Sequence, residues 1–335
     1  MNEPIGLGRS LLGRFRRTRS NRSEETGEKG DGDRVARYWA EMARGRAEKG
    51  SAPRGCPWTD SSLIQKFYIH PTISGTQEAN WLIWIKDNYF VEPAERALNI
   101  GCGDGCLERH GATIHLFKAC DALDISPGAI AVAKCLAEKS CLGRGINYQV
   151  ADSNTVRLKQ DWYDVIFSAM ALHHIANLEG LFEQIDASLI ENGLLILNEY
   201  VGPNRFQWTD AQLEIANDLL LLLPERYRVD PTTHTVKEAI RRQPLEHMIA
   251  IDPSEAVRSR DILPLVEERF TIVKRIDYGG TILNLLLDNI ILNFDEDRAG
   301  DMAMLRALFS LEKLLIRKGI LESDFSLIVA RKRTR

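Results

Sequence analysis

The stretch that decides the fold is LNIGCGDG, residues 98–105. It begins inside an apolar, strand-like segment at 97–100 and continues with glycines at 101, 103 and 105. Glycines directly after a strand let the backbone approach a nucleotide at the N-terminus of the next helix. Cys106 stands where a dinucleotide-binding fingerprint, G-x-G-x-x-G, has its third glycine, so the pattern disfavours NAD.

Strand-like and helix-like segments alternate from this loop onward. The pattern predicts strands at 97–100, 119–125, 147–151, 164–170 and 193–199. It predicts helices at 128–138, opened by the cap Ser126-Pro127, and at 178–190, stopped by Asn192-Gly193. Such alternation indicates an α/β fold with a parallel sheet and helices on both of its faces.

Two acidic residues lie where predicted strands end, at the same edge of this sheet. Asp124 comes 19 positions after Gly105, where a carboxylate can accept hydrogen bonds from both ribose hydroxyls of a nucleoside. Asp152 lies in Ala151-Asp152-Ser153, where it can accept from an exocyclic adenine amine. With the glycine loop, three sites converge where parallel strands end, which indicates a nucleoside-binding edge.

These stretches, with ALHHI at 171–175, resemble the successive motifs of class I S-adenosylmethionine-dependent methyltransferases. The resemblance covers residues 90–200, and the order of the motifs is its most specific part. It implies a Rossmann-like, doubly wound sheet of seven strands, mostly parallel with an antiparallel last strand. Segments 270–276 and 325–331 would supply the sixth and seventh strands.

The resemblance also implies a cofactor, S-adenosylmethionine, and the residues that hold it. Gly101, Gly103 and Gly105 would approach its methionine part, Asp124 its ribose and Asp152 its adenine. The whole expected set is Asn99, Gly101, Cys102, Gly103, Gly105, Asp124, Ile125, Ala151, Asp152, Ser153, Ser168, Ala169 and Met170. Stretches 107–109 and 199–208 look like a bacterial subgroup that we associate with methylation of small molecules or glycans.

Three residues are candidates for catalysis. Methyl transfer from a sulfonium is an in-line displacement, which needs alignment, exclusion of water and, for some acceptors, a base. His173 and His174 follow the fourth strand and suit proton removal; alternatively, one histidine fixes the loop and the other is partly exposed. Glu199 ends the fifth strand and either binds or deprotonates the acceptor, or anchors the following insertion through Arg205 or a helix N-terminus.

The expected acceptor is a small molecule, methylated on O or N, such as a sugar of a glycan or a secondary metabolite. Tyr200, Arg205 and Trp208 are the candidate acceptor-binding residues, although a tryptophan here can also simply pack under a lid. The apolar segment 283–292 is open to three interpretations: a packed helical wall, an acceptor pocket, or the face of a homodimer. Methylation of tRNA or protein, and a non-catalytic scaffold that binds the cofactor, are the alternatives.

The charge, the cysteines and the apolar runs of the sequence limit which partners, compartments and metal sites we expect. The net charge is −4 over 335 residues, so the chain as a whole lacks the excess of basic residues that is typical of nucleic-acid-binding proteins. The six cysteines show no disulfide-like or structural zinc pattern, which favours a reducing, cytoplasmic setting. No apolar run is long enough to span a bilayer or resembles a secretory signal. We expect no metal site, because two adjacent histidines in an extended loop point in different directions.

The chain divides into five expected regions. They are a disordered basic tail at 1–33, a helical cap at 34–92, the cofactor-binding core at 93–200, a lid insertion with a helix at 201–269, and the last two strands with a helical insertion at 270–335. The cap includes helices at 33–49 and 80–89, separated in part by a linker at 50–56. Further helices are predicted at 209–223, 253–267 and 302–318.

Overall fold

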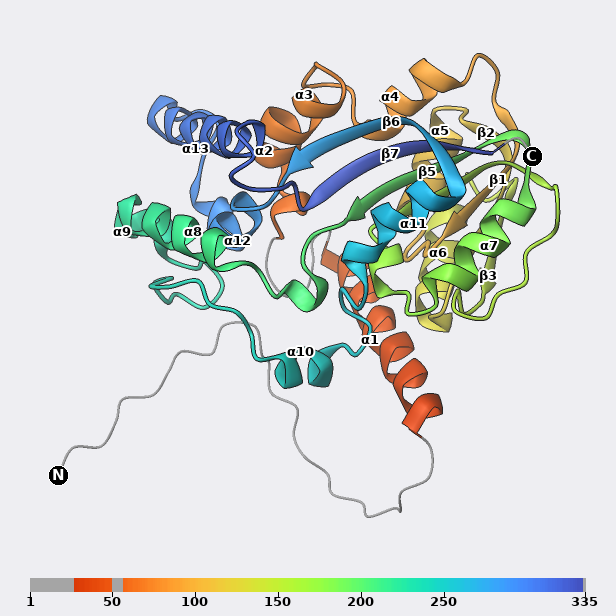
Figure 1. Cartoon of the computed structure of the whole chain (residues 1–335), viewed down its shortest axis with the longest axis horizontal. Coiled ribbons are helices and arrows are strands. Elements are labelled where there is room, and N and C mark those ends of the chain that lie inside the picture. The colour runs from red at the N-terminus through yellow and green to blue at the C-terminus, as the bar shows by residue number, and fades with distance from the viewer. Residues whose placement is uncertain (1–26, 50–56, 334–335) are drawn as a thin grey trace.

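A computed structural model describes residues 27–49 and 57–333, which build one seven-stranded sheet with helices on both faces (Figure 1). The strand order is β3-β2-β1-β4-β5-β7-β6, and β7 runs antiparallel to both of its neighbours. This confirms the predicted sheet and its antiparallel last strand. The strands are β1 (Ala94–Ile100), β2 (Phe117–Asp124), β3 (Ile146–Val150), β4 (Tyr163–Ala169), β5 (Leu189–Tyr200), β6 (Phe270–Gly279) and β7 (Phe325–Lys332).

The central strands are apolar because both faces of the sheet are covered. Ile166 in β4 packs on one face with α7 (Leu178–Ser188) and α11 (Ile262–Arg269). Its neighbours Val165 and Phe167 pack on the other face, where α4 (Trp81–Tyr89) lies. All three side chains are fully buried, as expected for parallel strands between two helical layers. Strand order reverses between β1 and β4, and that switch point opens a crevice at the carboxyl ends of the strands.

Local signals set most helix starts. Ser126 caps α6 (Pro127–Lys139) by accepting from the amide of Ala129, and its hydroxyl donates to the carbonyl of Ala36. The glycine loop runs into α5 (Cys106–Thr113). Helix α7 ends at Ser188 rather than at the predicted 190, because Leu189 already pairs with β4 in the sheet.

Helix α1 (Gly27–Lys49) is longer than predicted and includes residues 27–33, which we assigned to the tail. Residues 27–33 read GEKGDGD and contain no large apolar residue, so these turns carry no apolar spacing that sequence analysis could detect. The helix packs on α6, where Ala40 lies against Gly128. The rest of the expected tail and the expected linker at 50–56 lie outside the described residues.

The cap continues with short helices before β1. They are η1 (Trp58–Asp60), α2 (Ser62–Ile64), η2 (Gln65–Ile69), α3 (His70–Ile73) and α4. Trp58 and Tyr68 are fully buried among them, and α3 contacts β6. The cap thereby covers the end of the sheet that carries the last two strands.

The segment between β5 and β6 is an insertion of short helices. It holds η4 (Asn204–Phe206), α8 (Asp210–Leu222), α9 (Glu225–Arg228), α10 (Leu245–Ile251), η5 (Ser259–Asp261) and α11. A capping box between Thr209 and Gln212 starts α8. The predicted helix at 253–267 is wrong in its first half, because the carboxylate of Asp252 accepts from the amide and hydroxyl of Ser254 and holds a turn there.

The apolar segment before β7 forms α12 (Leu283–Leu287) and η6 (Ile290–Asn293), followed by α13 (Ala299–Arg317). Most of its large side chains are buried, including Leu283, Leu286 and Ile291. The packed wall is therefore the interpretation that fits, although Leu285 and Ile290 also reach a cavity.

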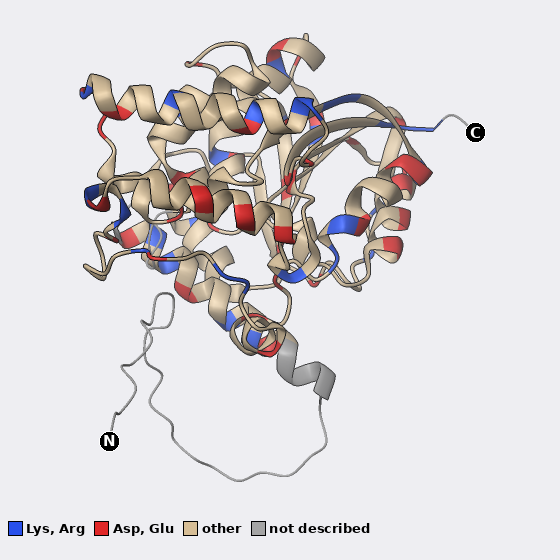
Figure 2. Ribbon diagram, turned by 60° about the vertical axis from the view of Figure 1, so that its left-hand side comes forward, with Lys and Arg blue, Asp and Glu red and all other residues tan. Residues whose placement is uncertain are grey.

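Two surface features complete the fold. Acidic and basic residues are interspersed over the helices and strands that Figure 2 draws. Within the described residues, no helix has both the length and the apolar composition that a membrane span requires.

Candidate active site

A cavity of about 1730 Å³ lies at the carboxyl ends of β1, β2, β4 and β5. Its other walls come from α1, from the insertion after β5 and from α12. The guanidinium of Arg34 in α1 donates to the carbonyl of Ala250 in α10, so the insertion and α1 meet beside it. Pockets for one small molecule are usually 300–1,000 Å³, so this volume suits two ligands side by side.

The glycine loop forms one end of the cavity. Gly101, Gly103 and Gly105 have φ of +75°, +54° and +78°, a left-handed conformation that favours glycine. A Cβ on Gly101 would lie 2.2 Å from the Cβ of Ala171, whereas a Cβ on Gly103 would meet nothing within 4 Å. The backbone at Gly103 is therefore bare toward the cavity, and Gly101 is required by packing as well as by conformation.

Asp124, at the end of β2, faces this loop. Its two carboxylate oxygens accept from the amides of Gly103 and Ser126, each at 2.8 Å. Burial raises the pKa of this carboxyl, although the two amides oppose the rise. Asp152, after β3, accepts from the amide and side chain of Asn154, both at 2.9 Å, and also lines the cavity. Both aspartates are thus held in place by hydrogen bonds that leave acceptor capacity unused.

Ten of the thirteen expected cofactor residues line the cavity: Asn99, Gly101, Cys102, Gly103, Asp124, Ile125, Asp152, Ser153, Ala169 and Met170. Gly105, Ala151 and Ser168 do not, and each supports the wall from behind. A Cβ on Gly105 would lie 2.4 Å from the hydroxyl of Tyr148. The amide of Ala151 donates to the carbonyl of Asp124, and the hydroxyl of Ser168 donates to the carbonyl of Ile100.

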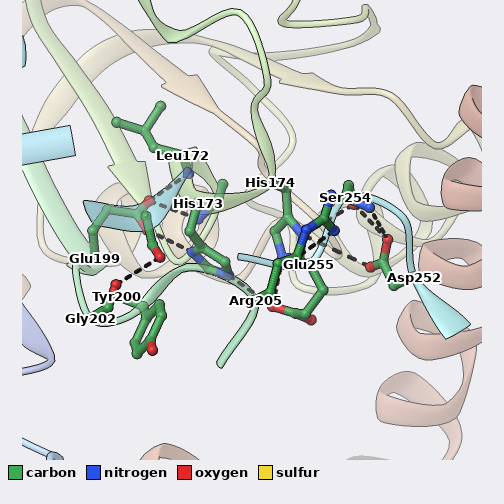
Figure 3. Close-up of polar contacts among 12 residues, drawn as sticks. Leu172, His173, His174, Glu199, Tyr200, Gly202, Arg205, Asp252, Ser254 and Glu255 are labelled. Atoms are coloured by element: carbon green, nitrogen blue, oxygen red, sulfur yellow. Dashed lines mark hydrogen bonds and ion pairs between the residues drawn. The ribbon is translucent and has the colours of Figure 1, made fainter. Parts of the chain in front are cut away.

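His173 is fixed by Glu199. Its Nδ1 lies 2.9 Å from Oε2 of Glu199, whose other oxygen accepts from the amides of Ala171 and Leu172 at 2.7 Å (Figure 3). Glu199 is fully buried and does not line the cavity, so it orients His173 and the loop after β4 instead of meeting an acceptor or Arg205. Burial lowers the pKa of His173, but Glu199 and the more distant Glu255 outweigh it and leave the pKa raised.

His174 lies beside His173, and the two rings have centroids 4.2 Å apart. Its Nδ1 is 3.2 Å from the hydroxyl of Ser254, which donates to Asp252. Burial, then the neighbouring His173, lowers its pKa well below the usual value. The prediction that the two histidines point in different directions is wrong, because residues 172–174 form the 3-10 turn η3 (Leu172–His174) instead of an extended loop.

Glu255 is the residue of this site that sequence analysis missed. Its Oε1 lies 3.6 Å from Nε2 of His173 and 4.0 Å from Nε2 of His174 (Figure 3). Burial raises the pKa of Glu255 to about 7, against the lowering effect of His173. It comes from the insertion, in a stretch that looked like a helix start, so no local signal marked it.

The candidate acceptor residues have different positions. Arg205 does not line the cavity; its guanidinium donates to the carbonyls of Pro253 and Glu255 and so holds the loop that carries Glu255. Tyr200 and Trp208 do line the cavity. The Tyr200 hydroxyl donates to a backbone carbonyl, and Trp208 stacks on Phe206 with 5.9 Å between ring centroids. Their rings form an aromatic wall.

Comparison with known proteins identifies the core. Residues 98–197 match the family model described as a methyltransferase domain. Residues 98–197 of this chain are a methyltransferase domain. The domain match and the motif series support the class I S-adenosylmethionine-dependent family, whose cofactor is S-adenosylmethionine, and the predicted fold is confirmed.

The matching curated proteins are related only in part. Malonyl-[acyl-carrier protein] O-methyltransferase 2 of Ilyobacter polytropus is 29% identical over 133 residues, which cover 39% of this chain and 50% of that protein. The corresponding Bacillus cereus enzyme is 23% identical over 167 residues, or 48% of this chain and 60% of that protein. The chain thus spans about half the length of the curated relatives it matches.

Solved structures share the fold over nearly the whole chain. Geranyl diphosphate C-methyltransferase of Streptomyces coelicolor, solved with Mg²⁺, geranyl diphosphate and S-adenosyl-L-homocysteine, has a TM-score of 0.54 at 12% identity and covers 92% of this chain and 100% of that one. The [4+2]-cyclase SpnF has a TM-score of 0.51 at 12% identity, covering 91% and 97%. At such identity the likeness extends to the fold alone.

Proposed function

We propose that this methyltransferase transfers a methyl group from S-adenosylmethionine to an oxygen or nitrogen atom of a small-molecule acceptor. The observation that carries the proposal is the cavity of about 1730 Å³, which extends from the glycine loop to an aromatic and aliphatic wall. A concave site between the sheet edge and the insertion favours a small acceptor, because a molecule bound there displaces water from the reacting atoms.

The cofactor would lie along the carboxyl ends of β1, β2 and β3. The bare backbone at Gly103 suits the methionine part, and the fixed carboxylate of Asp124 suits the ribose hydroxyls. Asp152 would accept from the adenine amine. Asn99 lines the cavity, and its buried side-chain oxygen has no protein partner among the described residues, so we propose that this oxygen accepts a hydrogen bond from the ligand's ammonium group.

The acceptor would occupy the part of the cavity beyond the two histidines. Tyr200, Trp208, Leu285 and Phe325 supply an apolar surface there, whereas His173, His174 and Glu255 supply the polar groups. This mixture favours a molecule with an apolar skeleton and one polar reacting group, as in many secondary metabolites, over a free sugar. The histidines are the side chains beside which we propose that the reacting group lies.

The alternative of a nucleic-acid acceptor finds less support in the charges of the insertion. Arg242 pairs with Asp210, and the guanidinium of Arg226 lies over the ring of Tyr227. Both of these arginines are thus already engaged within the protein. Phosphate recognition needs several free basic side chains along an open approach.

Calorimetric titration tests the part of the proposal that concerns the methyl donor, S-adenosylmethionine. We expect binding of S-adenosylmethionine and S-adenosylhomocysteine but not of NAD, and binding of NAD alone or of none of the three would contradict it. The acceptor half needs methyl-labelled cofactor and a panel of apolar alcohols, phenols and amines, with bulk tRNA and protein in parallel. Transfer to tRNA or protein alone would overturn the choice of a small acceptor.

A further inference from the structure

The two histidines present unprotonated nitrogens to the same carboxylate. Nδ1 of His173 faces a carboxylate, Glu199, which can only accept, so this nitrogen carries the proton. The single hydroxyl proton of Ser254 is given to Asp252, so Nδ1 of His174 must be the donor in its contact with Ser254. In both neutral rings the lone pair is therefore on Nε2.

These lone pairs converge with Glu255 on one point. The ligand atoms of His173, His174 and Glu255 all lie within 4.8 Å of one another, and all three residues line the cavity. The Nε2 to Oε1 distances of 3.6 and 4.0 Å exceed those of N–H···O hydrogen bonds, which are about 2.7–3.2 Å. The geometry therefore does not fit a hydrogen bond between either histidine ring and Glu255. Three hydrogen-bond acceptors instead face one another across a gap that suits a cation.

From this geometry we propose that His173, His174 and Glu255 bind a divalent transition-metal ion such as Zn²⁺, Fe²⁺ or Co²⁺. Two ligand atoms each about 2.1 Å from a tetrahedral metal are roughly 3.4 Å apart, so small side-chain shifts close the site. Two imidazoles and one carboxylate suit these ions better than Mg²⁺ or Ca²⁺, which prefer oxygen ligands.

The surroundings of the three ligands match those of metal sites in proteins. Ligating histidines usually donate their second nitrogen to a carboxylate or another fixed acceptor, and here Glu199 and Ser254 fill that role. Arg205 holds the backbone at Glu255. The ligands lie on one side of the ion, and the cavity side stays open for an oxygen-bearing ligand. Only this last role, receiving an acceptor oxygen, rests on the proposed function.

Metal titration of the untagged full chain tests the site. After dialysis against a chelator and removal of the chelator, the protein is titrated with Co²⁺, followed by visible absorption, and with Zn²⁺, followed by calorimetry. We expect one equivalent to bind. His174→Gln and Glu255→Gln should each weaken binding at least about tenfold. His110→Gln is the matched control, since His110 lines the same cavity without belonging to the cluster, and it should bind as the wild type does.

Two results would overturn the inference: no binding by the wild type, or equal binding by the wild type and both cluster variants. Circular dichroism and S-adenosylhomocysteine affinity show whether each variant is folded, and Glu255→Asp replaces any variant that is not. The cofactor titration keeps the two proposals separate. A chain that binds S-adenosylhomocysteine but no metal refutes the site alone, and one that binds metal but no cofactor refutes the proposed function.

Discussion

Replacing Asp124 by alanine removes one carboxylate from the end of the cavity that we propose to hold S-adenosylmethionine, the methyl donor. The amides of Gly103 and Ser126 fix that carboxylate at 2.8 Å each and leave a lone pair on each oxygen. Hydrogen bonds to a charged acceptor contribute about 1.5–3 kcal/mol each, and part of this is offset by desolvation of the carboxylate. We therefore expect Asp124→Ala to weaken cofactor binding by about 1–3 kcal/mol, or roughly 5- to 150-fold in Kd.

The assay is calorimetric titration with S-adenosylhomocysteine at one pH and one salt concentration. Asp121→Ala is the matched control, because Asp121 lies on the same strand, accepts from Tyr163 and Asn147, and does not line the cavity. This control should lower the melting temperature and leave Kd within about twofold. Asp124→Ala should also lower the melting temperature without ligand, since two amides lose their acceptor.

A ligand analogue without the ribose 2′-hydroxyl separates the direct contact from a change in the loop. The wild type should bind it more weakly than the parent compound, whereas Asp124→Ala should discriminate much less between the two. An unchanged Kd for a folded Asp124→Ala protein would refute the assignment. Equal discrimination by both proteins would mean that Asp124 acts through the loop and not on the ribose.

Three further predictions concern stability. Gly101→Ala puts a methyl group 2.2 Å from the Cβ of Ala171, at a backbone φ of +75°. Urea unfolding should show a loss of at least about 2 kcal/mol in the free energy of unfolding. A smaller loss contradicts the close packing. Burial raises the pKa of Asp324 to about 8, above its unfolded value near 4. Its protonation therefore stabilises the fold fully below pH ~4, and this stability is lost as the pH rises toward 8. Asp324→Asn should flatten that part of the melting-temperature profile, and parallel profiles would contradict the cause. Ser126→Ala removes the cap on Ala129, and thermal melts should show a loss of about 1 kcal/mol; unchanged melting would show that the cap contributes nothing.

The end of the cavity that we propose for the cofactor could be predicted because its signals are local. Gly101 and Gly103 come just after the apolar strand β1, Asp124 is the last residue of β2, and the carboxyl ends of neighbouring parallel strands meet at one edge. The period of the pattern fixed the strands to within a few residues. The helical turns at residues 27–33 were not predicted, because these residues include no apolar side chains at helical spacing.

The other end of the cavity could not be predicted, since it depends on contacts between distant segments. Glu255 follows His173 by 82 positions and reaches it only because the insertion folds back over the sheet. The turn at Asp252 replaced an expected helix and brought Ser254 to His174. Glu199 is expected from the sequence to meet the acceptor or to anchor the insertion through Arg205 or a helix N-terminus. Its partners are instead His173 and the amides of residues 171 and 172, in the loop after the neighbouring strand β4.

The matched domain ends at residue 197, and much of the wall that faces the acceptor lies outside it, in α1, in the insertion after β5 and in α12. If the cofactor and the acceptor bind as we propose, donor recognition and acceptor recognition are encoded in largely different stretches of the gene. Selection can exchange or lengthen the flanking segments while the donor-binding strands and glycine loop stay unchanged. The same division makes the chain suitable for chimeras in which a transplanted insertion brings a new acceptor preference to an unaltered donor site.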